Sequence, residues 1–360
     1  MSTEVKVEYD AKGMPFRRLG PSGLRVPLFS LGSWLTLGGS VRGDSVTGRD
    51  IFKTAFDHGI NMFDTAEGYA AGRSEEEMGR VIRELGLRRT DLIISTKLYW
   101  GPHKSPNASG LPRKHIIEGM KECLQRLGLE YVDIIFAHRP DRTVPMEETV
   151  RAFNYVINQG WAFYWATSEW SAEEIEEAYH VADKLDLVGP VAEQCRHHML
   201  HRERPEKEYA PIYRKYGTGT AVYSALAAGL LTGKYNNGIP PDSRLAVSQE
   251  QQYKDQAAML GTPEGEQMLA KIKTIAEFAE NELDCKVSHL ALAWVAKNPN
   301  TSTIILGASK PEQIVDNLKA LDVLPKLTPE VVEKIEAILA NKPAPQATFG
   351  RPPLDPFGRL

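Results

Sequence analysis

Short apolar runs alternate along the chain with longer segments in which apolar residues recur every three or four positions. The short runs have the length of buried strands and lie at 28–33, 60–64, 92–97, 132–137, 162–168, 191–194, 220–224 and 303–306. The longer segments have the spacing of amphipathic helices and include 49–58, 74–85, 113–127, 146–159 and 172–185. Such an alternation predicts parallel strands joined by right-handed crossovers.

Eight predicted strands in a chain of 360 residues favour an α/β fold of the closed (β/α)8 type, the TIM barrel. An open, doubly wound sheet fits the same alternation. However, sheets of that kind that bind dinucleotides carry a GxGxxG turn after a strand, and none of the predicted strands is followed by one. The strand count and the missing motif therefore favour the barrel.

Three segments lie outside this repeat. Residues 16–26 (FRRLGPSGLRV) predict a β-hairpin that could plug the bottom of the barrel. Residues 233–265, after the seventh strand, form a long polar insertion, and loops of that length are usually functional lids or disordered. The last twenty residues contain five prolines and predict an extended arm or a disordered tail. We expect one barrel domain at 1–340 and a Pro-rich tail at 341–360.

Start signals mark three of the helices. Ser74 with Glu77, and Ser171 with Glu174, have the spacing of a capping box. Pro311 stands where a helix would open. We expect helices to begin at these positions.

Composition narrows the classes of partner. The net charge is −4 without a basic block, which gives no indication of nucleic acid or of an anionic membrane. No apolar run approaches the roughly 18–20 residues that cross a bilayer, so we expect no membrane insertion. The N-terminal residues lack a signal core, and three widely spaced cysteines predict no disulfide framework. We expect a soluble cytoplasmic protein.

Four polar residues lie at or just after the ends of three successive predicted strands. Asp64 and Lys97 end the second and third apolar runs, His138 comes at the end of the fourth, and Tyr69 lies five residues beyond Asp64. In an α/β barrel these strand ends share one rim, where active sites lie. The four side chains can therefore converge although they are far apart in the sequence.

These residue types suit proton donation to a carbonyl. A phenol has a pKa of about 10, and a neighbouring ammonium lowers it by stabilising the phenolate. We predict Tyr69 as the proton donor, Lys97 as that ammonium, Asp64 as the carboxylate that keeps Lys97 charged, and His138 as a hydrogen-bonding group that orients the substrate oxygen. Another chemistry would make Lys97 the Schiff-base lysine of an aldolase. Its pairing with Asp64 argues against this, because an attacking amine must be neutral.

The segment FDTAEGYAAGRSEEEMG resembles the signature of the aldo-keto reductase family, and Lys97 and His138 fall where that family places its lysine and histidine. The likeness runs from FRRLGPSGL to NKP. Segments such as INMFDTAEGYAAG, LEYVDIIFAHRPD and LGASKPEQ are most similar to the branch that contains the β subunits of voltage-gated potassium channels. The resemblance implies NADPH-dependent reduction of aldehydes or ketones to alcohols.

The resemblance also implies that a nicotinamide cofactor, NADP(H), lies across the rim. The implied contacts are Ser33, Trp34, Asp64, Ser168, Gln194, Tyr223, Ser224, Leu226, Ala227, Gly229, Lys234, Arg244, Gly307, Ser309, Gln313 and Asn317. Ser168 and Gln194 would bind the carboxamide, and Tyr223 would stack on the nicotinamide ring. The loop that follows Tyr223 would lie under the pyrophosphate, with Lys234 and Arg244 supplying positive charge from the insertion, which would clasp the cofactor.

The adenosine end of this implied site has local support. Gly307 would permit a tight turn, and Ser309 stands at a helix N-terminus, where exposed N–H groups attract phosphate. Gln313 and Asn317 are four residues apart and share a helix face. Lys310 could assist a 2′-phosphate, which favours NADP(H) over NAD(H).

The substrate pocket is expected to involve Trp34, Tyr69, Trp100 and His138. Aromatic walls would suit aldehydes or ketones with apolar bodies. Trp170 also lies on a predicted rim loop.

The chain departs from the channel-subunit branch at several positions. Glu169 stands where that branch typically carries Arg, Tyr223 where it has Trp, and Ala225 where Pro is usual. His138 stands where animal channel subunits tend to carry an amide, which favours a working enzyme. The alternative is a regulatory, redox-sensing β subunit of a potassium channel with weak reductase activity. Channel subunits of this branch form fourfold tetramers, so a homo-tetramer is compatible with the resemblance.

Two further motifs carry no function. GLLTGKY (229–235) has the wrong spacing for a P-loop. The histidines at 197, 198 and 201 lack the glutamate of a zinc-protease pattern, and we expect no metal site.

Overall fold

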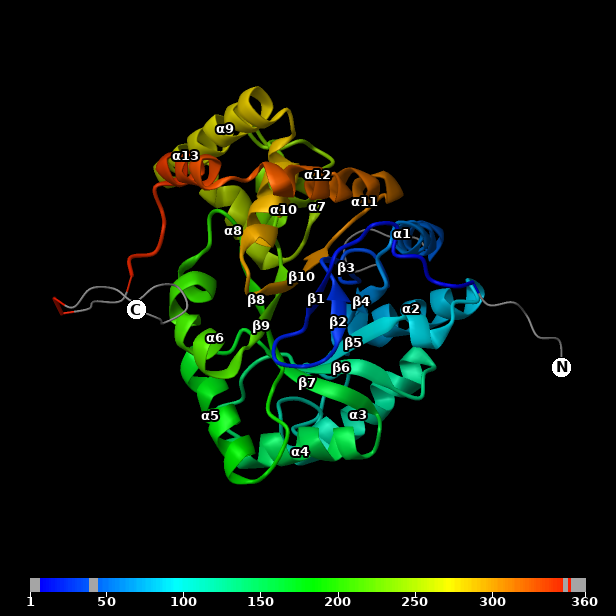
Figure 1. Cartoon of the computed structure of the whole chain (residues 1–360). Coiled ribbons are helices and arrows are strands. Elements are labelled where there is room, and N and C mark those ends of the chain that lie inside the picture. The colour runs from blue at the N-terminus through cyan, green and yellow to red at the C-terminus, as the bar shows by residue number, and fades with distance from the viewer. Residues whose placement is uncertain (1–6, 39–44, 346–348, 351–360) are drawn as a thin grey trace.

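The centre of the structure, a computed structural model that describes residues 7–38, 45–345 and 349–350, is a closed barrel of eight parallel strands (Figure 1). The strands are β3 (Phe29–Gly32), β4 (Met62–Asp64), β5 (Ile93–Leu98), β6 (Val132–Ala137), β7 (Ala162–Ser168), β8 (Ala192–Arg196), β9 (Gly219–Tyr223) and β10 (Thr301–Leu306). Each strand pairs with the next along the chain, and β10 closes the barrel against β3. The predicted (β/α)8 barrel is confirmed, and each predicted strand overlaps an observed one.

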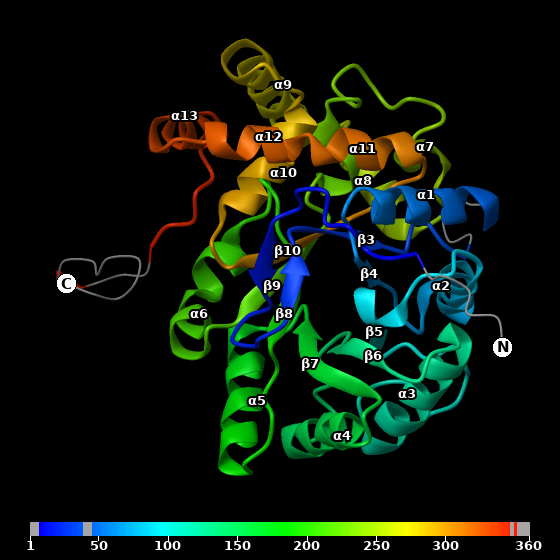
Figure 2. The same cartoon turned by 45° about the vertical axis from the view of Figure 1, so that its right-hand side comes forward.

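Helices surround this barrel. They are α1 (Ser45–Asp57), α2 (Arg73–Glu84), α3 (Arg113–Leu127), α4 (Met146–Asn158), α5 (Ala172–Lys184), α6 (Ala210–Tyr216), α9 (Pro263–Leu283), α10 (Val287–Lys297), α11 (Pro311–Leu318), α12 (Ala320–Val323) and α13 (Pro329–Leu339). Figure 2 shows α1 to α5 following one another around the strands, while α9 to α13 cover the remaining side. The five predicted helices are all present.

Apolar side chains pack on both faces of the barrel wall. One buried cluster takes residues from the strands β4 to β10 and includes Met62, Ile93, Phe136 and Ile305, so it fills the interior. Alternate residues such as Phe63 belong to a second cluster between the strands and the helices. The barrel is therefore a packed core rather than a pore, as is usual for this fold.

The hairpin closes the end of the barrel where the strands begin. Its strands, β1 (Phe16–Arg18) and β2 (Arg25–Pro27), are antiparallel, as predicted. Leu19 and Val26 join the interior cluster. The Arg17 guanidinium donates to the carbonyl of Thr301, at the first residue of β10 (2.7 Å). A site formed by the strands must therefore lie at the opposite rim.

Two of the three predicted helix starts are confirmed, and one is wrong. Ser171 caps α5 in a capping box: its Oγ accepts from the Glu174 N–H (3.2 Å), and the Glu174 carboxylate accepts from the Ser171 N–H (2.9 Å). Pro311 opens α11 as expected. The prediction for Ser74 is wrong, because α2 already begins at Arg73 and the Ser74 hydroxyl turns inward, where it is buried.

The insertion after β9 is more regular than the sequence suggested. It contains α7 (Arg244–Val247) and α8 (Gln251–Met259), and α9 begins at Pro263. The Tyr253 side chain of α8 is buried, which anchors this segment to the barrel. Of the two alternatives for this insertion, disorder is therefore wrong, because α8 is anchored by a buried ring, and a lid stays a prediction.

The predicted tail lies mostly outside the described residues. Residues 341–345 follow α13 without regular secondary structure. The Asn341 amide donates to the Met199 carbonyl (2.8 Å) and accepts from Arg202 (3.0 Å). Arg202 also pairs with Glu206 and with Glu336 of α13 (2.8 and 2.6 Å). This arginine therefore ties the end of the helical layer to the loop after β8.

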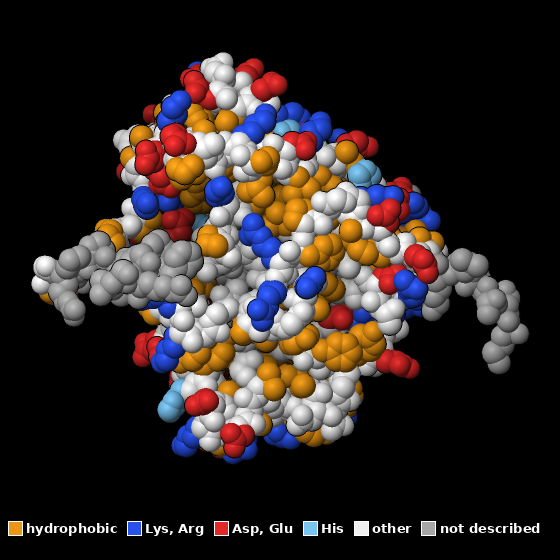
Figure 3. Space-filling view, viewed as in Figure 1, with side chains coloured by type: hydrophobic (Ala, Val, Ile, Leu, Met, Phe, Trp, Pro, Cys, Tyr) orange, Lys and Arg blue, Asp and Glu red, His pale blue; other side chains and the backbone are white. Residues whose placement is uncertain are grey.

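The face seen in Figure 3 carries Lys and Arg interspersed with Asp, Glu and apolar side chains, for example over α9 and α13. This agrees with the near-neutral charge balance of the sequence. Among the described helices, none combines the length and the apolar character that crossing a membrane requires.

Replacing Arg202 by methionine should lower the free energy of unfolding by about 2–3 kcal/mol, because two largely buried carboxylates lose their cation. Urea unfolding followed by tryptophan fluorescence measures this. The matched control is Arg151→Met, which removes a pair with Glu147 whose side chains are half exposed. The control should cost less than about 0.5 kcal/mol. Equal losses in the two variants would contradict the assignment.

Candidate active site

Polar side chains gather at the open rim, where the strands end. Asp64, Ser168 and Tyr223 are the last residues of β4, β7 and β9. Lys97 stands one residue before the end of β5, and His138 follows β6 directly. The barrel topology therefore brings these sequence-predicted residues to one rim.

A buried ion pair forms the base of the site. The fully buried Lys97 ammonium donates to the Asp64 carboxylate in a very short contact, and to the Thr65 carbonyl (2.8 Å). The other Asp64 oxygen accepts from the Ser95 hydroxyl (2.7 Å) and the Gln194 amide (3.3 Å). Burial is the largest single effect and acts to lower the pKa of Lys97. The Asp64 charge, the interaction with Tyr69 and the hydrogen bonds to both residues together outweigh burial, so the pKa lies above its ordinary value. The lysine therefore remains an ammonium at neutral pH.

Tyr69 lies directly over this pair. Its ring centroid is 4.8 Å from the Lys97 Nζ. Burial raises the pKa of the Tyr69 phenol, and the Lys97 charge lowers it only in part. The sequence correctly predicted that Lys97 acts to lower the pKa of Tyr69. The expectation that this pKa lies below its ordinary value is wrong, because burial of the phenol has a larger, opposite effect. Tyr69 consequently carries its proton at neutral pH.

His138 completes the cluster as a neutral ring. Its centroid lies 5.7 Å from that of Tyr69 and 4.7 Å from that of Trp100, both edge to face. Burial, together with the positive charges of Lys97 and Arg139, lowers the pKa of His138 well below its usual range. Its buried Nδ1 has no hydrogen-bond partner among the described residues. A neutral imidazole is thus held beside the phenol.

The tryptophans that were expected at the pocket divide into two groups. Trp34 lies beside Tyr69 (ring centroids 6.4 Å apart), and Trp100 is 45% exposed above His138. Trp170 is almost fully buried and packs beneath the rim. The four residues proposed for substrate binding therefore lie together, and Trp170 has a packing role.

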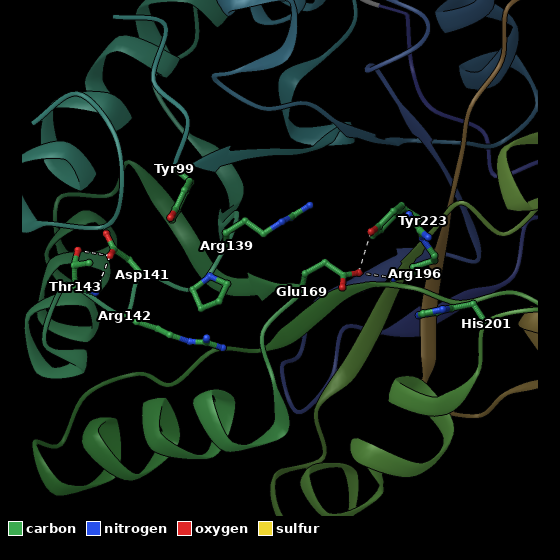
Figure 4. Close-up of a pocket in the computed structure, with 10 residues that line it drawn as sticks. Tyr99, Arg139, Asp141, Arg142, Thr143, Glu169, Arg196, His201 and Tyr223 are labelled. Atoms are coloured by element: carbon green, nitrogen blue, oxygen red, sulfur yellow. Dashed lines mark hydrogen bonds between the residues drawn. The ribbon is translucent and has the colours of Figure 1, made fainter. Parts of the chain in front are cut away.

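A cavity of about 770 Å³ opens beside this cluster (Figure 4). Its walls are Tyr99, Arg139, Pro140, Asp141, Arg142, Thr143, Glu169, Arg196, His201 and Tyr223. Asp141 and Thr143 lie at one end in Figure 4, and Arg196 and Tyr223 at the other. The residues predicted for an aromatic pocket lie beside this cavity, and the cavity itself combines charged side chains with the rings of Tyr99 and Tyr223. Sequence reasoning did not single out the three arginines of this cavity, Arg139, Arg142 and Arg196.

Glu169 holds Tyr223 in place. Its backbone has a left-handed φ of 57°, and its carboxylate accepts from the Tyr223 hydroxyl (2.9 Å), the Arg204 guanidinium (3.0 Å) and the Arg196 N–H (2.8 Å). Two of the departures noted in the sequence are therefore bonded to each other. Sequence reasoning missed this pairing because the two residues are 54 positions apart.

The loop after Tyr223 makes a compact left-handed turn. Ser224, Ala227 and Gly229 have φ angles of 58°, 49° and 97°. A Cβ at Gly229 would lie 3.0 Å from the Lys234 Cε, so both its conformation and its packing favour glycine. Leu226 is partly exposed in the same turn. The turn therefore brings Lys234 against the backbone of the predicted pyrophosphate loop.

Ser33 and Ser168 lie on either side of the ion pair. Ser33, after β3, is buried and accepts from the Ser74 hydroxyl (2.7 Å). Ser168 accepts from the Arg139 guanidinium (3.4 Å). Both predicted residues face the rim with partners that position their hydroxyls.

The predicted adenosine end lies on the connection from β10 to α11. The Ser309 N–H donates to the Gln313 side chain (2.8 Å), and Asn317 is buried one turn further on. We expected glycine at position 307 because of a tight turn, but its backbone is not left-handed. A Cβ there would instead lie 2.9 Å from the Leu35 side chain, so close packing favours glycine.

Sequence reasoning missed Tyr253, because it gave residues 233–265 no helix and singled out only their charged residues. Its ring stacks on Trp34 (centroids 6.0 Å apart, 28° between planes). The Arg244 guanidinium lies over the same ring, 5.4 Å from its centroid. These contacts connect the insertion to the ring beside Tyr69.

Within the described part of the chain, no group of three or more His, Cys, Asp or Glu side chains is placed to hold a metal ion. His197 instead pairs with Glu206 (2.9 Å).

Comparison with known proteins agrees with this geometry. The model of the aldo/keto reductase family matches residues 29–340, and the chain belongs to this family. A barrel with a tyrosine, a lysine, an aspartate and a histidine on its rim is thus placed in a family of reductases.

Several relatives carry a more particular name. The chain is 49% identical over 331 residues to a "Probable voltage-gated potassium channel subunit beta" of Arabidopsis thaliana, covering 92% of this chain and 98% of that protein. It is 52% identical over 336 residues to a "Putative voltage-gated potassium channel subunit beta" of Schizosaccharomyces pombe, covering 93% and 96%. A relative in Oryza sativa subsp. japonica, named like the Arabidopsis protein, is 49% identical over 331 residues and covers 92% and 98%. The similarity to channel β subunits is therefore confirmed.

The His138 ring should titrate with a pKa below the value of about 6.5 that is ordinary for histidine. Replacing Lys97 by methionine removes one of the nearby positive charges and should raise that pKa. NMR of ring-labelled histidine measures both, and Lys53→Met, at an exposed site, is the control. A His138 pKa at or above the ordinary value would show that the ring is not held neutral.

Proposed function

We propose that this protein reduces aldehydes or ketones to alcohols with NADPH as the hydride donor and Tyr69 as the general acid. The observation that carries the proposal is the contact of a protonated phenol with a buried ammonium and a neutral imidazole. Such a group is positioned to deliver a proton to an oxygen that becomes negatively charged.

The rim has features that suit NADP(H). Tyr223 presents a ring fixed by Glu169, a platform on which a nicotinamide could stack. Lys234 and Arg244 bring positive charge to the glycine-containing turn and the insertion, and Lys310 is exposed beside Ser309. When bound, the cofactor would supply the hydride.

The side chains of the protein would manage the proton. Tyr69 would hold its proton until the substrate oxygen gains negative charge, and would then donate it. The Lys97 ammonium would stabilise the phenolate left behind, and Asp64 would keep that ammonium charged. The neutral His138 would hydrogen-bond the same oxygen and orient the carbonyl.

The Schiff-base alternative is disfavoured by the same ion pair. An amine attacks a carbonyl only when it is unprotonated. Asp64 raises the pKa of Lys97, so the nucleophilic form is scarce at neutral pH. Borohydride should therefore fail to trap a covalent adduct at Lys97.

A second function, as a channel subunit, is favoured by the identity of about half the residues with proteins named as channel β subunits. The two functions are compatible, because one barrel can carry a reactive rim and a binding surface.

We expect a homo-tetramer in solution. Size-exclusion chromatography with light scattering tests this, and a mass four times that of the chain would support the prediction. A monomer at micromolar concentration would speak against the second function.

Replacing Tyr69 by phenylalanine should reduce kcat for 4-nitrobenzaldehyde by at least about 100-fold, because the proton donor is lost. NADPH binding, measured by fluorescence titration, should be retained. Turnover is followed by NADPH absorbance. The matched control is Tyr131→Phe. This tyrosine directly precedes β6, at the end of the barrel opposite the site, and its ring packs on Phe163.

Unchanged turnover in Tyr69→Phe would remove Tyr69 from its proposed role. Turnover with NADH but none with NADPH would refute the proposed cofactor.

A further inference from the structure

The proposed reaction uses the ring cluster and leaves the polar cavity beside it without a role. Two guanidinium groups belong to that cavity. In Figure 4, Arg139 extends toward Tyr223, and Arg196 lies next to the same tyrosine. Arg139 therefore extends from the end of β6, next to His138, toward the predicted nicotinamide platform, where Arg196 also lies.

The guanidinium groups of Arg139 and Arg196 form no salt bridge among the described residues. The neighbouring arginines do: Arg142 pairs with Glu174, and Arg204 pairs with Glu169. The two carboxylates on the cavity wall already have other partners. Glu169 accepts from Arg204, Tyr223 and the Arg196 backbone N–H, and Asp141 accepts from the Leu111 N–H (2.8 Å) and the Thr143 hydroxyl (2.6 Å).

Arg139 is also held in position. It donates to the His138 carbonyl and to the Ser168 hydroxyl, and its guanidinium lies 5.0 Å from the centroid of the Trp100 ring. The same Trp100 ring contacts His138 edge to face. An anion bound at Arg139 would therefore lie close to the oxygen that Tyr69 protonates. A fixed guanidinium loses little side-chain freedom when it binds a carboxylate or phosphate.

Arg142 lines the cavity too but differs from these two. Its side chain is 83% exposed and pairs with Glu174 (2.9 Å). Because Arg142 lines the same cavity but already has a carboxylate partner, it serves as the matched control for the other two arginines.

We propose that Arg139 and Arg196 form an anion-binding subsite, and that the substrates of this protein are aldehydes or ketones bearing a carboxylate or phosphate. This inference rests on the proposed reductase function and replaces the apolar substrate body that the sequence suggested. Arginine binds such groups through paired, charge-assisted hydrogen bonds, which give both affinity and orientation.

The test compares 4-carboxybenzaldehyde with its methyl ester, using the full-length protein and NADPH. The wild type should prefer the acid by about 10-fold in kcat/KM, the scale of one hydrogen bond to a charged group. Arg196→Gln should abolish most of this preference, whereas Arg142→Gln should keep it. The preference should also fall as salt is added, because ions screen the contact.

Several results would overturn the inference. Equal kcat/KM values for the acid and the ester in the wild type would do so. So would an Arg196→Gln variant that keeps the preference but binds NADPH more weakly, since the guanidinium would then serve a cofactor phosphate.

If neither compound is reduced, the proposed reductase function fails. The anion-binding subsite is then tested separately, by measuring the binding of benzoate and benzamide. Saturable quenching of tryptophan fluorescence by benzoate but not benzamide, lost in Arg196→Gln, would uphold the subsite. Equal behaviour of benzoate and benzamide would reject it.

Discussion

The pairing of Lys97 with Asp64 inside the barrel rim is the interaction on which the site depends. A buried ammonium alone would lose its proton or destabilise the fold, because desolvation penalises the charge. The carboxylate, the Thr65 carbonyl and the hydrogen bonds from Ser95 and Gln194 to Asp64 offset that penalty. The result is a fixed positive charge beneath the Tyr69 ring, where it can stabilise a phenolate only after the proton has left.

Burial favours the uncharged form of both groups above this pair. It raises the pKa of Tyr69 and lowers that of His138, so both are neutral at rest. Each keeps a proton that can take part in hydrogen bonding to a substrate oxygen. Arg139 adds a second fixed charge at the edge of the same cluster. The rim thus combines neutral, proton-bearing groups with permanent cations, which suits a reaction in which negative charge develops on oxygen.

Much of this could be predicted from the sequence, because local patterns specify it. The strand count and the missing dinucleotide-binding motif favoured the barrel over an open sheet, and the strand ends placed Asp64, Lys97 and His138 on one rim. The misses were long-range or energetic. The Glu169–Tyr223 contact joins residues 54 positions apart, and α8 depends on the burial of Tyr253 against Trp34. The direction of the Tyr69 pKa shift required weighing burial against charge, which no residue pattern reveals.

The most direct measurement of the central claim is the protonation state of Lys97 in the folded protein. Heteronuclear NMR of the side-chain Nζ across a pH titration reports it. We expect an ammonium that persists to a pH above the ordinary lysine value of about 10.4, and a lower titration point in Asp64→Asn. A neutral Lys97 amine at pH 7 in the wild-type protein would contradict it.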